Sequence, residues 1–335
     1  MHSVDSVLAG DRLTLSRLLT QIENDTLEGR EALNLLFPYT GKAHLIGITG
    51  APGTGKSSLV NRLARYYRHP PKGEQARRVA IVAVDPSSPF TGGAILGDRV
   101  RMRDLAGDAG VFIRSMASRG SLGGLANATT GFVQVFDAAG YDTVIIETVG
   151  AGQAEVDIVR LAHTTIVVQS PGLGDDIQAI KAGILEIADI LVVNKADLPG
   201  VESTERALYS MLELVYHDSR LPASTTDPAD TASKRLTSFW VPPIVRTIST
   251  EGTGIPDLAS AISNHHLFLN KTGEWKQRER NRFQAELESM LREALLLRWH
   301  KKIDDGHYRE VLNRLIERRI SPHRAVAELL NGGAQ

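Results

Sequence analysis

Cysteine is missing from this sequence. A chain without thiols forms no disulfide framework and offers no thiolate ligand to a metal, so both classes of protein are excluded. An excess of charge of one sign is missing too, because 38 basic residues nearly balance 39 acidic residues. Without an overall basic field, we expect neither nucleic acid nor an anionic membrane as the main partner.

Long apolar runs are also lacking. The first residues include an early acid, Asp5, and no stretch is apolar over the length that a membrane span needs. We therefore expect a cytoplasmic protein without a secretory signal. The composition that remains, with 42% hydrophobic and 23% charged residues, is typical of a globular protein with a sizeable core.

A phosphate-binding motif stands near residue 50. The pattern G-x-x-x-x-G-K-[ST] is complete, preceded by an apolar run at 45–49 and followed by apolar residues at helical spacing. Its glycines let backbone N–H groups converge on phosphate oxygens at a helix N-terminus. We expect Lys56 to reach the β and γ phosphates and the Ser57 hydroxyl to bind Mg²⁺. The predicted phosphate-binding residues are Gly50, Ala51, Pro52, Gly53, Thr54, Gly55, Lys56, Ser57 and Ser58. A glycine-rich turn that matches by accident is the alternative, and the flanking patterns disfavour it.

Short apolar runs recur along the chain and alternate with helical patterns. They lie at residues 45–49, 79–84, 111–113, 144–146, 165–168, 190–193 and 244–245. Strands that are apolar on both faces and separated by helices predict a parallel sheet that is covered on both sides. We predict an α/β fold, a doubly wound and mostly parallel P-loop domain at residues 41–266, with its ligand at the carboxyl ends of the strands.

Helical patterns continue beyond this domain at both ends. Residues 1–40 are predicted to form an N-terminal helical extension. Residues 267–335 carry apolar stripes that either dock on the main domain or meet a second subunit, and we favour a dimerisation arm and a homodimer. Residues 218–238 are predicted to be a loop. The pair His265-His266 is interpreted as a helix end rather than a metal site.

Two short segments predict which base the bound nucleotide carries. Asn194-Lys195-Ala196-Asp197 follows an apolar run and matches N-K-x-D. Its last residue, Asp197, is suited to accept hydrogen bonds from guanine N1–H and the N2 amino group, neither of which adenine offers. Ser249, Thr250 and Glu251 follow the next run and are expected to pass over guanine O6. We therefore predict GTP or GDP, rather than ATP, as the bound nucleotide.

Several acidic residues and a glycine are candidates for binding Mg²⁺ and the γ phosphate. The segment from Glu147 to Gly150 resembles the D-x-x-G switch of GTPases, with Glu in place of Asp. Glu147 is predicted to hold Mg²⁺ and the Gly150 N–H to meet the γ phosphate. Asp85 and Asp98 are further metal candidates, or alternatively helix caps or partners of arginines. Gln153 lies too far beyond Gly150 to match the water-positioning Gln of many GTPases, so slow hydrolysis until a partner completes the site is expected.

Together, several segments resemble the MeaB/ArgK family of P-loop GTPases, which includes the methylmalonic aciduria type A proteins. The segments are DPSS at 85–88, TGGAILGDRVRM at 91–102, LGG at 122–124, ETVGAGQ at 147–153 and NKAD at 194–197. The resemblance implies a GTPase chaperone that gates adenosylcobalamin loading and protects a cobalamin-dependent acyl-CoA mutase, usually methylmalonyl-CoA mutase. It also implies a homodimer, a mutase that accelerates GTP hydrolysis, and the adenosyltransferase of that mutase as a further candidate partner.

The resemblance assigns roles to individual residues. Asp85, Asp98 and Glu147 take the Mg²⁺ neighbourhood, with Ser57. Asn194, Lys195 and Asp197 take the guanine. Residues 171–178, with Lys181 beyond, resemble an additional switch that relays the nucleotide state to the mutase. The catalytic candidates are Lys56, Glu147, Gly150, Asp175 and Lys181. The chain departs from the family pattern at 115–120 and 218–238, which leaves the client mutase open.

Other functions are compatible with parts of the pattern. A GTPase metallochaperone for a nickel enzyme is one, although the lack of cysteine and of a His-rich tract counts against it. A protein kinase that acts on a transport-system binding protein is another, but no acceptor site is specified. A binding module without turnover is a third, and the combination of Lys56, Ser57 and Glu147 argues against it.

Overall fold

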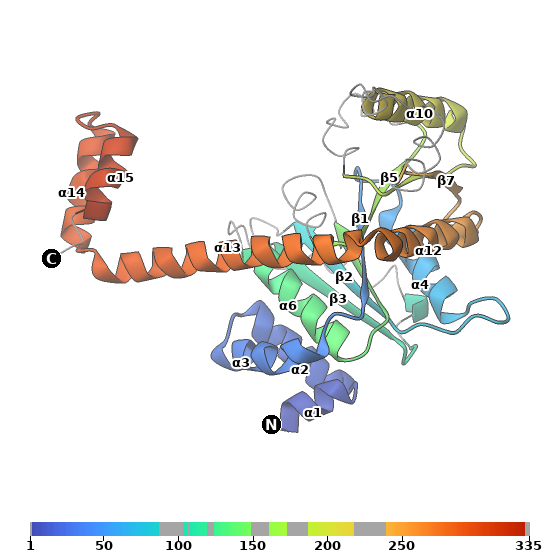
Figure 1. Cartoon of the computed structure of the whole chain (residues 1–335), viewed down its shortest axis with the longest axis horizontal. Coiled ribbons are helices and arrows are strands. Elements are labelled where there is room, and N and C mark those ends of the chain that lie inside the picture. Colours follow the sequence, from blue (N-terminus) through green and yellow to red (C-terminus); the bar gives the residue numbers. More distant parts are fainter. Residues whose placement is uncertain are drawn as a thin grey trace, which may run out of the picture. The chain divides into compact units, whose positions relative to one another are not determined.

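The computed structural model describes residues 2–86, 103–105, 107–118, 124–148, 161–172, 187–217 and 239–331. The chain forms two compact units, residues 1–280 and residues 281–335. Figure 1 labels the helices and strands. The division into residues 1–40, 41–266 and 267–335 stays a prediction.

A seven-stranded sheet forms the centre of the first unit, in the order β3-β2-β4-β1-β5-β6-β7. Every pair of neighbouring strands is parallel. The strands are β1 (His44–Thr49), β2 (Val79–Pro86), β3 (Val111–Ser118), β4 (Thr143–Thr148), β5 (Thr164–Gln169), β6 (Ile190–Asn194) and β7 (Ile244–Thr247). The predicted parallel α/β sheet is thereby confirmed, and each apolar run became a strand.

Helices surround this sheet in the first unit. They are α1 (His2–Leu8), α2 (Arg12–Glu23), α3 (Leu27–Leu36), α4 (Lys56–Arg68), α6 (Gly124–Ala138), α10 (Val201–His217) and α12 (Ile255–Thr272), with short 3-10 turns η1 (Phe37–Tyr39) and η2 (Arg103–Leu105). Polar side chains form the N-caps of α2 and α3. Asp11 accepts a hydrogen bond from Thr14 N at 2.8 Å, and Thr26 accepts one from Gly29 N at 3.1 Å.

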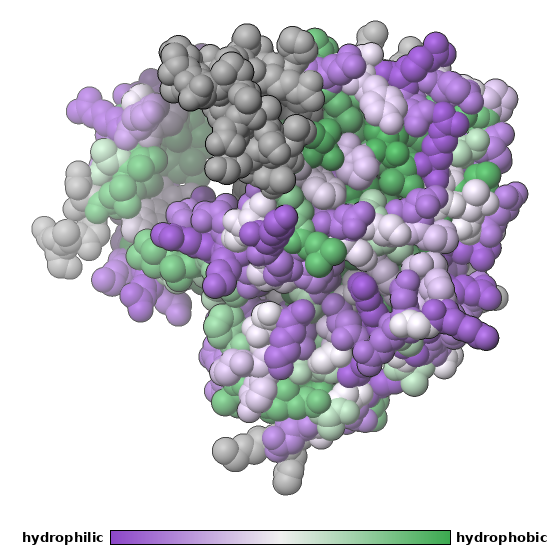
Figure 2. Space-filling view, turned by 45° about the vertical axis from the view of Figure 1, so that its right-hand side comes forward, coloured by the Kyte–Doolittle hydropathy of each residue, from purple (hydrophilic) through white to green (hydrophobic). Residues whose placement is uncertain are grey.

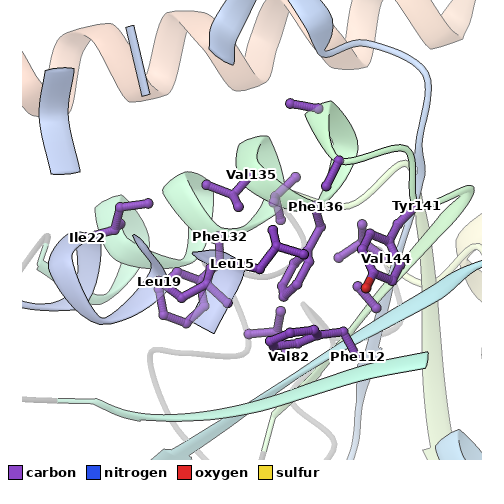
Figure 3. Close-up of a cluster of buried hydrophobic side chains, with 14 of the residues drawn as sticks. Leu15, Leu19, Ile22, Val82, Phe112, Phe132, Val135, Phe136, Tyr141 and Val144 are labelled. Carbon is purple, nitrogen blue, oxygen red and sulfur yellow. The ribbon is translucent and has the colours of Figure 1, made fainter. Parts of the chain in front are cut away.

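Hydrophobic clusters cover both faces of the sheet. On one face, Leu15 and Leu19 of α2 pack with Phe132 and Phe136 of α6 against strand residues that include Val82 (Figure 3). On the other face, α4 and α12 pack together over β1 and its neighbours. Since the central strands β1, β4 and β5 are buried along their whole length, they carry apolar residues on both faces rather than alternating ones.

The N-terminal helices are part of the first cluster. Besides its apolar contacts, α2 is held to β3 by two side chains. Arg12 donates to the carbonyl of Val111 at 2.6 Å, and Arg114 pairs with Glu23 at 2.6 Å with both side chains largely buried. The predicted helices before residue 40 are therefore present, and they complete the core of the sheet on that face.

A buried polar network lies at the amino ends of β1, β5 and β6. Asp189 receives both guanidinium NH groups of Arg278, at 2.7 and 2.8 Å, and lies 3.2 Å from His265. Although burial opposes a charged carboxylate, these partners hold the pKa of Asp189 below its usual value. His265 also meets Thr164 at 2.9 Å, and Glu279 meets His163 at 2.8 Å.

The interpretation of His265-His266 as a helix end is wrong. Both residues lie inside α12, and the His265 side chain is completely buried. His266 stacks on Trp275 and tilts against His44. Burial and these neighbouring imidazoles hold the pKa of His44 well below its usual value. The pair belongs to a network between elements far apart in sequence. Among the described residues, no group of three or more His, Asp and Glu side chains is arranged to hold a metal ion.

Helix α13 (Glu274–Lys302) leads into α14 (Asp305–Ile316) and α15 (Pro322–Asn331). In the second unit, α14 and α15 pack through buried Val311 and Ala325 and a 2.6 Å ion pair between Arg314 and Glu328. Trp299 donates to the carbonyl of Leu329 at 3.3 Å. The residues of α13 are exposed or only partly buried.

The face seen in Figure 2 is mostly hydrophilic, with hydrophobic residues in small groups. Of the helices that the structure describes, none has the length and apolar character of a membrane span.

Candidate nucleotide-binding site

Those predicted nucleotide-binding residues that the structure describes lie at the carboxyl edge of the sheet. The phosphate loop follows β1, Glu147 lies in β4, Asn194 ends β6, and Ser249 follows β7. Because all strands run in the same direction, their carboxyl ends form a single edge, and loops distant in sequence meet there. One difference from the prediction is that β4 continues through Glu147 and Thr148 instead of ending before them.

The phosphate loop depends on glycine at two crowded positions. Gly50 has a φ of 143°, and a Cβ there would lie 2.2 Å from the carbonyl oxygen of Val168. Gly55 has a φ of 90°, and a Cβ there would lie 2.4 Å from Asn194 Nδ2. Gly55 begins α4 without a side-chain cap. The first N–H groups of α4 therefore lie at a helix N-terminus that suits an anion.

The Lys56 ammonium lies inside this loop. Its Nζ donates to the carbonyl oxygens of Gly50 at 2.7 Å and Ala51 at 3.1 Å, and only 6% of the residue is exposed. A buried positive charge encircled by backbone is an unusual arrangement for structural purposes alone, since desolvation of an ammonium is costly. The position is the one that a phosphate-binding lysine needs.

Ser57 and Glu147 form the predicted metal side of the site. The Ser57 hydroxyl donates to Glu147 Oε1 at 2.6 Å, and both residues are buried. The pairing of Ile48 with Glu147 brings β4 beside the end of β1, which explains why residues 90 positions apart touch. A hydroxyl and a carboxylate are hard oxygen ligands, so this pair fits Mg²⁺.

The amide of Asn194 joins three segments of the site. Its Nδ2 donates to the carbonyl of Thr54 at 2.8 Å, and its Oδ1 accepts from Thr247 Oγ1 at 3.0 Å and from Ser249 Oγ at 2.7 Å. The phosphate loop and the loop after β7 are therefore tied to one side chain. The next residue, Lys195, has a φ of 58°, and Asp197 is exposed.

The loop after β7 is a tight turn. The N–H groups of Glu251 and Gly252 donate to the carbonyl of Ile248 at 3.0 and 2.9 Å, and Ile248 N donates to Thr253 O at 3.0 Å. Gly254 has a φ of 76°, and a Cβ there would lie 1.9 Å from the carbonyl of Arg246. Ser249 of this turn meets Asn194, and Thr250 and Glu251 follow it in the same turn. Contact of these residues with the base stays a prediction.

Two side chains of the site were missed in the sequence. Thr247 donates a hydrogen bond to the side chain of Asn194, and Arg62 of α4 donates to the carbonyls of Ser249 and Thr250. Thr247 follows an apolar run and was detectable as a polar strand end. Arg62 has no local signature, because its role depends on how α4 and the loop after β7 lie in space.

Several predicted site residues lie outside the described residues. They are Asp98, Gly150, Asp175 and Lys181, together with most of the predicted additional switch. Asp85 lies near the end of β2, opposite Ala117 of β3, and its side chain is not described. Their roles toward Mg²⁺, the γ phosphate and a partner stay predictions.

Comparison with known proteins gives a consistent result. A family described as methylmalonyl Co-A mutase-associated GTPase MeaB matches residues 15–304. A putative GTPase of Pyrococcus abyssi is 41% identical over 98% of this chain and 97% of its own length. A methylmalonic aciduria type A homolog of Mus musculus, described as mitochondrial, is 27% identical over 87% of this chain and 68% of its own length. Among solved structures, that of an LAO/AO transport system kinase is 26% identical with a TM-score of 0.70, covering 98% of this chain and 96% of the other.

Proposed function

The chain belongs to the MeaB family of GTPases, and from this premise we propose that it is a Mg²⁺-dependent GTPase and a chaperone of a cobalamin-dependent acyl-CoA mutase. The observation that carries the GTPase part is the 2.6 Å contact between Ser57 and Glu147, beside a phosphate loop whose lysine is buried. Oxygen ligands for a divalent cation and a cationic loop for phosphates lie together, as hydrolysis of a nucleoside triphosphate requires.

In the proposed site, separate groups of residues bind the phosphates, the base and Mg²⁺. The backbone N–H groups of the loop and Lys56 hold the phosphates, and Asp197 and the loop after β7 bind the guanine. Ser57 and Glu147 hold Mg²⁺, which when bound neutralises charge on the β and γ phosphates. The hydrogen bonds of the Asn194 side chain keep the phosphate loop and the loop after β7 at a fixed separation, so that one nucleotide meets both loops.

The chaperone part rests on the names of relatives. The family is described as associated with methylmalonyl-CoA mutase, and the mouse relative is named for methylmalonic aciduria. We propose that this chain gates the loading of adenosylcobalamin onto such a mutase and protects it, that the mutase and its adenosyltransferase are its partners, and that it acts in the cytoplasm. The competing activity is that of a kinase, because the similar solved structure is described as a transport system kinase.

The test of this function is the rate of GTP hydrolysis by the purified protein, alone and with a cobalamin-dependent acyl-CoA mutase from the same organism. We expect slow turnover alone and an increase of about 100-fold with the mutase, the size of effect that one added charge or hydrogen-bond donor has at a transition state. ATP serves as the control nucleotide, and an unrelated protein at the same concentration as the control partner.

Other outcomes of this assay separate the alternatives. GTP turnover that no such mutase changes would contradict the chaperone function and leave a GTPase with another client. Transfer of label from [γ-³²P]GTP to a transport-system binding protein would instead favour the kinase. Absence of turnover with every partner would contradict GTP hydrolysis itself.

We also propose that the chain forms a homodimer through its C-terminal helices. Exposed apolar residues follow one another along α13 at helical spacing, including Leu287, Leu291 and Leu295, which are 67%, 54% and 54% exposed. Further exposed apolar residues on α14 and α15 are Leu312, Ile316, Val326 and Leu330. A second copy of the chain is a partner that can bury this much apolar surface symmetrically.

Sedimentation equilibrium of a Leu287→Asp and Leu291→Asp double variant tests the dimer. We expect the unaltered protein to sediment as a dimer and the variant as a monomer, because two buried carboxylates without partners oppose association. Ala285→Asp places the same charge on another side of α13 and should leave the dimer intact. A monomeric unaltered protein, or a variant that stays dimeric, would contradict the proposal.

A further inference from the structure

The loop that follows β7 is held by an arginine from the phosphate-loop helix. Arg62, in α4, donates through Nε to the carbonyl of Ser249 at 2.9 Å and through a terminal NH₂ group to the carbonyl of Thr250. The two acceptors are consecutive carbonyls of the segment predicted to meet guanine. The contact joins residues 187 and 188 positions apart, so it is a tertiary contact.

Helix packing places Arg62 where it can make this contact. Leu59 and Leu63 of α4 lie in the same buried cluster as Ile255, Leu258 and Ile262 of α12. Helix α12 begins directly after the loop, at Ile255. Since α4 and α12 are packed on each other, the loop that leads into α12 lies beside α4, within reach of an arginine one residue before Leu63.

The contact of Arg62 fixes the orientation of the peptide group between Ser249 and Thr250, which the contacts of Asn194 do not determine. Asn194 Oδ1 accepts from the N–H and the hydroxyl of Ser249, which holds the peptide group before Ser249. Arg62 holds the carbonyl of Ser249, and thereby the next peptide group. In a planar trans peptide the C=O and N–H point in opposite directions. The Thr250 N–H is therefore turned away from Arg62.

From this geometry we propose that Arg62 is a positioning residue for guanine recognition, which aims the Thr250 N–H at the O6 oxygen of the base. The inference rests on the proposed guanine site and adds a specificity determinant to it. A guanidinium suits this task because its planar fork binds two acceptors at once, whereas an ammonium is a point charge. Recognition of O6 thus depends on a residue that does not touch the base.

The test compares GDP with two analogues that change one edge atom each. 6-Thio-GDP replaces O6 by sulfur, a weaker acceptor, and IDP lacks the N2 amino group. With Arg62→Ala, we expect GDP to bind about tenfold more weakly, the loss expected for a misplaced hydrogen-bond donor. The preference for GDP over 6-thio-GDP should fall toward one, while the preference for GDP over IDP should remain as in the unaltered protein.

Two matched variants complete the experiment. Arg65→Ala removes the same side chain from an exposed position of α4, and it should change neither preference. Arg62→Lys keeps one charged donor and should give an intermediate loss of the O6 preference. Circular dichroism during thermal unfolding confirms that each variant is folded.

The outcomes keep this inference separate from the function on which it rests. An unchanged preference for GDP over 6-thio-GDP in folded Arg62→Ala would overturn the role of Arg62. Equal weakening of GDP, 6-thio-GDP and IDP would overturn it too, because a merely structural loss affects all three alike. If the unaltered protein fails to prefer GDP to ADP, the guanine site itself is refuted.

Discussion

Replacing Lys56 by alanine is expected to lower GTP turnover by at least about 100-fold and to weaken nucleotide binding strongly, while the protein stays folded. The ammonium lies inside the phosphate loop, 2.7 Å from the carbonyl of Gly50, where it would meet the β and γ phosphates. Alanine removes that charge and a hydrogen-bond donor together. The fold should tolerate the change, because removal of a buried ammonium also removes its desolvation cost.

Three measurements on Lys56→Ala check this expectation: GTP turnover, the affinity for a fluorescent GDP analogue, and the thermal unfolding midpoint. Lys72→Ala is the matched control, since Lys72 is exposed in the loop that follows α4. Turnover that stays at the level of the unaltered protein would mean that Lys56 is not a phosphate ligand. A large drop in the unfolding midpoint would instead give Lys56 a structural role.

The second large effect is expected from Asp197→Asn, which should change the preferred base from guanine to xanthine. A carboxylate at this position accepts from guanine N1–H and the N2 amino group, whereas an amide can donate to the O2 oxygen of xanthine. We expect GTP to bind at least about 100-fold more weakly and XTP to bind more tightly than before, because a site built for one hydrogen-bonding edge rejects another. Asp197 is exposed, so little effect on stability should accompany the change.

Competition of GTP, XTP and ATP against a fluorescent nucleotide measures this exchange. Asp305→Asn, an exposed carboxylate on α14, is the control for the loss of one negative charge. Full preference for GTP in Asp197→Asn would show that another residue recognises the base edge. Failure of the variant to bind either GTP or XTP would show that Asp197 supports the site as a whole.

Local patterns in the sequence were sufficient to predict the strands. Runs such as 79–84 and 190–193 are apolar on both faces, and that requirement follows from burial in a parallel sheet. The order of the strands was not predictable in the same way. β4 lies between β1 and β2, although β2 precedes it in the chain, because strand order depends on pairing between distant segments.

Prediction of the candidate site shows the same division. The phosphate loop, Glu147 and N-K-x-D are local motifs, and the structure brings them to one edge. The contacts of their side chains depend on neighbours far along the chain. Arg62 therefore escaped notice, and His265 was assigned to a helix end although its partners, Thr164 and Asp189, lie on other elements.

The buried polar network has a consequence for evolution. The side chains of Asp189, His265 and Arg278 belong to three segments that come together only in the folded chain. Loss of any one of them leaves a buried group without its partner, at a cost of about 3–5 kcal/mol. Replacement of the whole set by apolar residues that fill the same volume need not carry that cost. Among descendants of a common ancestor these positions should therefore be kept together or exchanged together, and rarely be found half replaced.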